Sequence, residues 1–149
     1  MVTIRFDVRH RFDHPADVVW AELVDWRRHA DWIPFTTIDI EDGDPTEVGR
    51  ELTARTGFGP LALVDRMRVA RCDWDAARSA GDCVVDKVGP VLHGRAGFTV
   101  EPDGSGCALD WFEDVSVRHV PQFVAPLGAW IGAFFFRQGM GRLAKKLST

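Results

Sequence analysis

Residues 2–12 read VTIRFDVRHRF and residues 13–25 read DHPADVVWAELVD, and the change of period between them decides the fold. The first stretch alternates between a mostly apolar face and a polar, arginine-rich face, which is typical of a half-buried β-strand. Pro15 suits the first turn of a helix, and apolar residues follow it at helical spacing. We therefore expect a strand that leads into a helix ending near Asp25.

Beyond this start, the chain passes through a short helical region, a series of strands and a long helix. Residues 26–34 hold two tryptophans and stop at a proline, which predicts a second short helix or a compact loop. From Thr36 to Arg118 the period returns to two, and turn-forming clusters divide it into five or six antiparallel strands. After Pro121 the alternation disappears, and residues 123–147 read as one long helix that starts at Phe123 or after Pro126. The turn clusters are 41–45, 57–60, 75–81, 89–90 and 102–106.

This order of elements predicts an α+β fold built on one curved antiparallel sheet of six or seven strands. Two short helices follow the first strand, the first strand lies beside the last, and the long C-terminal helix lies over the concave face. A sheet wrapped against a helix in this way normally encloses a cavity. The length of 149 residues suits one domain, so we expect residues 1–149 to form a single ligand-binding unit.

Composition excludes several classes of protein. The three cysteines are at least eleven positions apart, which argues against a CxxC metal site or a disulfide framework and favours a cytoplasmic location. We expect no metal and no cofactor. No apolar run reaches the roughly 18 residues of a spanning helix, and the first ten residues do not resemble a signal peptide. A net charge of -4 disfavours a nucleic-acid binder.

Several short motifs, taken together in their order and spacing, resemble the START-like (SRPBCC) superfamily in its polyketide cyclase/dehydrase-like branch. The resemblance covers essentially the whole chain. It implies a helix-grip fold that encloses a pocket for apolar or aromatic small molecules. It leaves the reaction open, because the superfamily mixes carriers, cyclases, dehydratases and proteins without known activity. The motifs are PADVVWAEL (15–23), WIP (32–34), VG (48–49), VDRMRV (64–69), VGP (88–90), Gly94, GF (97–98) and LDWFE (109–113).

Four polar residues fall on the apolar, inward face of their strands: His10, Asp65, Lys87 and Glu113. A buried charge without a partner is costly, so each of them must be paired, hydrated or shifted in pKa. His10 lies near a strand end, where water can solvate it. Asp65, Lys87 and Glu113 are therefore the main exception to the apolar inner face of the predicted sheet.

The turns allow an estimate of how these residues line up across the sheet. If the turn at 102–106 closes a symmetric hairpin, Ala96 lies opposite Glu113. If the preceding turn is centred near Val91-Leu92, Lys87 lies opposite Ala96, about 10 Å from Glu113 at the backbone. One row across four strands then holds Met67, Lys87, Ala96 and Glu113, with Asp65 diagonal to Lys87.

These considerations give the candidate ligand-binding residues Trp32, Asp65, Met67, Lys87, Phe98, Trp111 and Glu113. The polar cluster among them is open to three interpretations. It can be an internal ion-pair network, a polar patch that orients a ligand carbonyl or hydroxyl, or an acid/base site in which Lys87 steadies an enolate. Taken singly, the aromatic residues are more typical of a core, and the resemblance implies that some of them face the cavity. Met67 can equally be core filler.

The function predicted from the sequence is the binding of a small apolar or aromatic molecule, lipid-like or polyketide-like, between the sheet and the C-terminal helix. One alternative is a cofactor-independent polyketide cyclase or dehydratase that uses pocket carboxylates. The chain has no tyrosine and no GxSxG, HExxH, P-loop or complete GxGxxG motif, so no catalytic residue is named. A second alternative is an interaction module that docks an apolar partner segment in an open groove lined by Trp130 and Phe134.

The C-terminal helix changes its apolar side midway. Large apolar residues occupy one side in its first half and nearly the opposite side in its second half, while small residues continue the second stripe backwards. Packing within the chain is the expected reason, and a homodimer contact through this helix is the next. The first set is Leu127, Trp130, Ile131, Phe134 and Phe135, the second set is Phe136, Met140, Leu143 and Leu147, and the small residues are Gly128, Ala129, Gly132 and Ala133.

Overall fold

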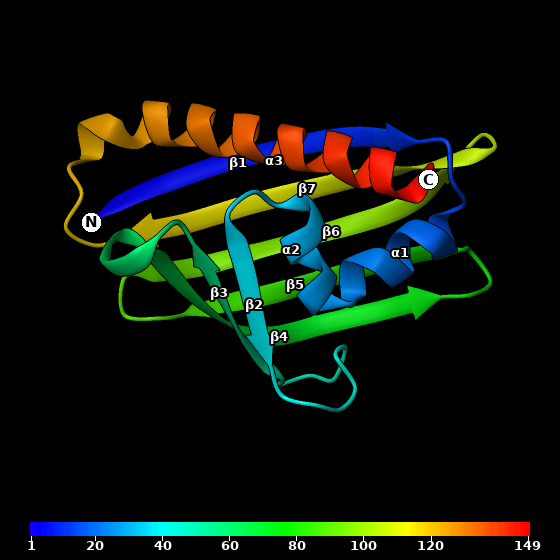
Figure 1. Ribbon diagram of the computed structural model, residues 1–149, viewed down its shortest axis with the longest axis horizontal. Coiled ribbons are helices and arrows are strands. Elements are labelled where there is room, and N and C mark those ends of the chain that lie inside the picture. Colours follow the sequence, from blue (N-terminus) through cyan, green and yellow to red (C-terminus); the bar gives the residue numbers. More distant parts are fainter.

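The computed structural model describes residues 1–149 as one seven-stranded antiparallel sheet with all its helices on the concave face (Figure 1). The strand order is β1-β7-β6-β5-β4-β3-β2, so the first strand lies beside the last, as predicted. Six strands lie between Thr36 and Arg118, which also agrees with the prediction. The fold is the predicted α+β helix-grip arrangement.

The strands are β1 (Val2–Phe12), β2 (Thr36–Ile40), β3 (Glu51–Thr56), β4 (Leu63–Asp75), β5 (Ala80–Val88), β6 (Leu92–Asp103) and β7 (Gly106–Val117). The α-helices are α1 (Ala16–Val24), α2 (His29–Trp32) and α3 (Ala125–Leu147). Three short 3-10 turns, η1 (Trp26–Arg28), η2 (Gly59–Leu61) and η3 (Gln122–Val124), connect them.

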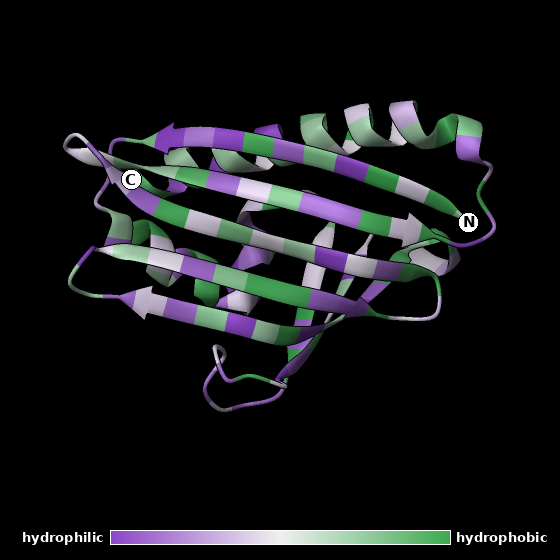
Figure 2. Cartoon of the chain, turned by 180° about the vertical axis from the view of Figure 1, so that it is seen from behind, coloured by the Kyte–Doolittle hydropathy of each residue, from purple (hydrophilic) through white to green (hydrophobic).

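The alternation of the sequence becomes the two faces of the sheet. Figure 2 shows hydrophilic and hydrophobic residues following each other along the strands. In β4 the alternation shifts by one residue, because the pairing with β5 has a bulge between Val69 and Arg71. The bulge keeps apolar residues inside on both sides of it: Met67 and Val69 are buried before it, and Cys72 is buried after it.

One predicted pairing is wrong. Lys87 pairs with Gly94, whereas Ala96 pairs with Val85 on one side and with Glu113 on the other. The turn between β5 and β6 joins the paired residues Val88 and His93, so its centre lies one residue earlier than expected. Moving the centre of a hairpin by one residue moves the pairing by two, which preserves the face. Lys87 and Glu113 therefore still point into the same side of the sheet.

The two halves of α3 pack differently. Gly128 and Gly132 lie against β1, where a Cβ on Gly128 would be 2.7 Å from Ile4 and a Cβ on Gly132 would collide with the ring of Phe6. Glycine is required there because the helix approaches the strand so closely. In the second half, Met140 and Leu143 are fully buried.

The expected packing within the chain fails for the first half of α3. Four of its large apolar side chains, and that of the preceding Phe123, are 51% to 83% exposed, because the glycine side of the helix faces the sheet. The large apolar residues of the helix that are exposed are Leu127, Trp130, Ile131 and Phe134. The rings of Trp130 and Phe134 stack on each other with centroids 5.9 Å apart.

No helix in the structure is both long enough and apolar enough to cross a lipid bilayer.

Candidate functional site

A cavity of about 370 Å³ lies between the concave face of the sheet and the helices α2 and α3. Twenty of its 29 lining residues are hydrophobic. Its size and apolar character are those of small-molecule pockets in proteins. Leu63, at the start of β4, and Ile131, in the first half of α3, line the cavity and are also exposed to solvent. Both elements reach the end of the sheet where η2 and the start of α3 lie (Figure 1).

Aromatic rings form one wall of the cavity. Phe98 on β6 stacks on Trp111 on β7, with centroids 5.5 Å apart and planes inclined by 18°. Trp111 stacks in turn on Phe136 of α3, with centroids 4.9 Å apart. The first stack follows from the pairing of Phe98 with Trp111 across the two strands. A continuous aromatic wall of this kind suits the flat face of a ring or an alkyl chain.

A cluster of charged side chains interrupts the apolar lining. The Lys87 Nζ contacts Asp65 Oδ2 and lies 3.4 Å from Glu113 Oε2. The Trp111 Nε1 donates a hydrogen bond of 3.2 Å to Glu113 Oε1. The residues of β6 nearest to this contact are Gly94 and Ala96, whose small size lets the lysine reach across the strand.

Burial determines the protonation of this cluster. The side chains of Lys87 and Glu113 are only 5% and 8% exposed. Burial raises the pKa of Glu113 and Asp65 raises it further, against the lowering effect of Lys87. Burial acts to lower the pKa of Lys87, but the charges of Glu113 and Asp65 outweigh it, so that pKa is raised. Lys87 is therefore an ammonium at neutral pH, whereas Glu113 gains a proton more readily than an ordinary glutamate.

Six of the seven candidate residues line the cavity: Asp65, Met67, Lys87, Phe98, Trp111 and Glu113. Trp32 does not. It is fully buried behind the lining, with its ring edge-on to Trp111 at 6.0 Å, and Gly139 of α3 packs against it. Trp32 thus supports the aromatic wall from outside.

The cavity has a polar lining residue that the sequence reasoning missed, His29 of α2. Its Nε2 donates a hydrogen bond of 2.6 Å to the carbonyl oxygen of Leu23, and burial lowers its pKa to about 4, so it is neutral at pH 7. The signal was present in the sequence. Trp26, His29 and Trp32 follow each other at intervals of three residues, which places them on one side of a helical segment. His10, in contrast, lies outside the cavity, beside Phe12.

The sequence of the chain matches one protein family over almost its whole length. Residues 3–148 match the family described as polyketide cyclase / dehydrase and lipid transport. The chain belongs to this family. The predicted resemblance is thereby confirmed.

Solved structures confirm the START-like fold of this polyketide cyclase/dehydrase family member. A START superfamily protein from Mycobacterium smegmatis is 14% identical, with 97% of each chain covered and a TM-score of 0.69. A protein from Chromobacterium violaceum is 15% identical over 99% of this chain and 97% of that chain, with a TM-score of 0.65. Major latex-like protein 151 from Panax ginseng is 14% identical over 98% of each chain, with a TM-score of 0.63. No curated protein matches the sequence. Identities this low show the fold alone.

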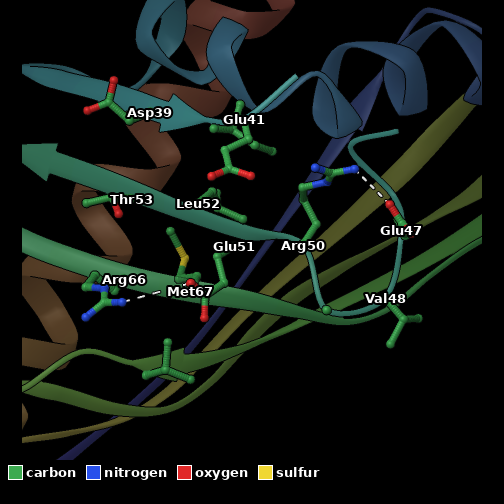
Figure 3. Close-up of a pocket in the computed structure, with 13 residues that line it drawn as sticks. Asp39, Glu41, Glu47, Val48, Arg50, Glu51, Leu52, Thr53, Arg66 and Met67 are labelled. Carbon is green, nitrogen blue, oxygen red and sulfur yellow. Dashed lines mark hydrogen bonds and ion pairs between the residues drawn. The ribbon is translucent and has the colours of Figure 1, made fainter. Parts of the chain in front are cut away.

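A second hollow of about 720 Å³ lies between the 41–50 loop and strands β2 to β4 (Figure 3). Arg50 lies 2.7 Å from Glu47 there, and Arg66 lies 3.9 Å from Glu51. Only five of its 13 lining residues are hydrophobic, against 20 of 29 in the inner cavity. The inner cavity of this family member is therefore the candidate site for an apolar ligand. In the whole chain, no three histidine, cysteine, aspartate or glutamate side chains come together to hold a metal ion.

Proposed function

We propose that residues 1–149 act as one ligand-binding domain that holds a small apolar or aromatic molecule, as a carrier, sensor or other non-catalytic module. The observation that carries the proposal is the cavity beneath α3, with 20 hydrophobic residues among its 29 lining residues. Membership of a family described by polyketide cyclase and lipid transport supports it. The charged cluster on the wall gives such a ligand a fixed orientation by binding its carbonyl or hydroxyl group.

A neutral fluorescent probe, N-phenyl-1-naphthylamine, tests this proposal. We expect saturable binding at one site and a rise in thermal stability that grows with probe concentration. Ala96→Phe fills the cavity from β6 and is expected to weaken binding, because Ala96 is a buried lining residue. Ala77→Phe, in an exposed turn, is the matched control and is expected to bind as the natural protein does. No saturable binding by any apolar probe, with no molecule retained in native mass spectrometry, would overturn the proposal.

A second candidate is the cofactor-independent cyclase or dehydratase, which the raised pKa of Glu113 favours. A carboxyl group with a raised pKa can take a proton from a carbon next to a ligand carbonyl, and the neighbouring Lys87 ammonium can stabilise the enolate that forms. Glu113→Gln would then abolish turnover of a polyketone substrate while binding persists. For a carrier, the same substitution changes binding modestly and there is no turnover to lose.

The interaction-module alternative required an open groove lined by Trp130 and Phe134. Neither residue lines the cavity, and both face outward. A homodimer contact through α3 stays a proposal, which the exposed apolar side chains of its first half support. Sedimentation of the natural protein and of Trp130→Gln tests it, with a dimer expected only for the former. The cytoplasmic location also stays a prediction, for cell fractionation to test.

A further inference from the structure

We propose that the cavity selects ligands with a protonated amine on an apolar or aromatic body, and that the amine binds the free oxygen of Asp65. This inference rests on the proposed ligand binding and adds the chemical class of the ligand. It is carried by a count of the charges that face the cavity and by the hydrogen bonds those charges already make.

The charges that face the cavity do not balance. Its lining contains two carboxyl groups, Asp65 and Glu113, and a single ammonium, Lys87. The other ionisable groups of the lining are His29 and the Cys83 thiol. Burial lowers the pKa of His29, while a hydrogen bond with Cys72 and then burial raise the pKa of Cys83, so both are neutral. The part of α3 that lines the cavity contributes only Gly128, Ile131, Gly132, Phe135 and Phe136, and β1 contributes only Ile4 and Phe6. One carboxyl group therefore has no cation of its own.

The hydrogen bonds identify the carboxyl oxygen that is free. Both oxygens of Glu113 have partners, Trp111 on one and Lys87 on the other. Asp65 gives only Oδ2 to Lys87, and its Oδ1 is buried with no hydrogen-bond partner. The Asp65 side chain is only 15% exposed and lines the cavity, and a turn of its carboxyl group brings the enclosed Oδ1 to the cavity side. An ionised carboxylate is purely an acceptor, so the group that completes it must be a donor.

A ligand ammonium meets both needs at once. It donates to Asp65 Oδ1, and it supplies the positive charge that the cluster lacks, in a place where water screens the attraction poorly. A ligand hydroxyl supplies only the donor. A ligand carboxylate supplies neither and adds a negative charge. The order of affinity for ligands with the same ring system is therefore amine, then alcohol, then acid.

The groups that act on Glu113 are Lys87 from β5, Asp65 from β4 and Trp111 on its own strand. Burial raises the pKa of Glu113, and a second ammonium beside it lowers that pKa, because an opposite charge favours the ionised carboxylate.

The test uses three probes with one ring system: 1-naphthylmethylamine, 1-naphthalenemethanol and 1-naphthoic acid. Calorimetric titration of the natural protein at pH 7 is expected to show the amine binding roughly tenfold or more tightly than the alcohol, and the acid least tightly. Asp65→Asn is expected to bring the amine and alcohol affinities together, whereas Asp110→Asn, on the outer face of β7, is expected to keep them apart.

The outcomes separate this inference from the proposed function. If the alcohol binds as tightly as the amine in the natural protein, or if Asp65→Asn keeps the difference, the amine preference is overturned while ligand binding stands. If none of the three probes binds, and N-phenyl-1-naphthylamine does not bind either, both proposals fall. The comparison of amine with alcohol in the natural protein does not depend on the folding of any variant.

Discussion

Two lysines in this protein each lie between an aspartate and a glutamate, but in opposite surroundings. Lys87 joins Asp65 and Glu113 inside the cavity. Lys146, near the end of α3, lies 2.7 Å from Asp31 of α2 and 2.9 Å from Glu22 of α1, with its side chain 32% exposed. The outer cluster also has a second cation, since Arg28 lies 2.7 Å from Glu22.

The difference separates a structural cluster from a binding cluster. In the outer cluster two partly exposed cations, Arg28 and Lys146, share the carboxyl groups of Glu22, Asp25 and Asp31, and these contacts join α1, α2 and α3. The inner cluster has one cation for two carboxyl groups, is mostly buried, and leaves one carboxyl oxygen without a partner. A buried arrangement of this kind costs desolvation energy that a stable fold alone does not require. It is consistent with a ligand that completes it.

The largest expected effect comes from removing the lysine of each cluster. Lys87→Met leaves buried carboxyl groups without their cation and is expected to lower the free energy of unfolding at pH 7 by roughly 3 to 5 kcal/mol. Lys146→Met is the matched control and is expected to cost about 1 kcal/mol or less, because water screens that pair. Urea denaturation of both variants measures the difference. Equal losses would show that water reaches the inner cluster as freely as the outer one.

The next largest effect is expected from His29, whose ring lies 6.1 Å from that of Trp111 and near the charges of Glu22 and Asp25. Its pKa is about 4 in the folded protein and about 6.5 when unfolded, so the unfolded chain binds protons more readily. The free energy of unfolding should therefore fall by about 3 kcal/mol as the pH drops from about 6.5 to about 4. His29→Gln is expected to reduce this acid-dependent loss of stability. His14→Gln is the control, because His14 is only partly buried, and it is expected to leave the loss unchanged. An unchanged acid profile for His29→Gln would place the acid sensitivity elsewhere.

Acid is expected to restore part of the stability that Lys87→Met loses. Burial raises the folded pKa of Glu113 above 4.5, and the loss of the lysine removes the charge that held it down. The penalty for an ionised Glu113 exists above that raised pKa and disappears as the pH falls through it. The gap between Lys87→Met and the natural protein should thus narrow from pH 7 to pH 5. Lys146→Met should show no such narrowing, and denaturation at several pH values measures both.

Much of the fold was predictable from the sequence, because the spacing of apolar residues and the residues that form turns determine structure locally. The alternation in residues 2–12, the proline at 15 and the turn at 102–106 each determine their own segment. The pairing of Lys87 was not predictable in the same way. A turn at Gly89-Pro90 can close around either of two centres, and the choice between them depends on contacts made elsewhere in the sheet.

The sequence predicted the site residues that are charged and lie on the apolar face of a strand. It did not predict the residues whose position depends on tertiary packing. Asp65, Lys87 and Glu113 break an apolar stripe, which made them visible. Trp32 and His29 share one side of a helical segment, and only the packing against Gly139 places the tryptophan behind the lining and the histidine in it. The outward orientation of Trp130 likewise follows from the close approach of Gly128 and Gly132 to β1, which no periodicity reveals.

The smallest expected effect has opposite signs in the two clusters. Glu113→Gln keeps the shape of the side chain and removes the carboxyl group that exceeds the single cation. The remaining Lys87–Asp65 pair is then neutral, so we expect unfolding at pH 7 to stay within about 1 kcal/mol of the natural protein, on the stabilising side.

Glu22→Gln is the matched change in the outer cluster, where two cations face Glu22. It removes the one carboxylate that both Arg28 and Lys146 contact, and it is expected to destabilise the protein by up to about 1 kcal/mol. Urea denaturation of the two variants in parallel measures the signs. If Glu113→Gln costs several kcal/mol instead, the glutamate is a required partner of Lys87 in a self-contained network. The surplus carboxyl group would then not be available to balance a ligand charge.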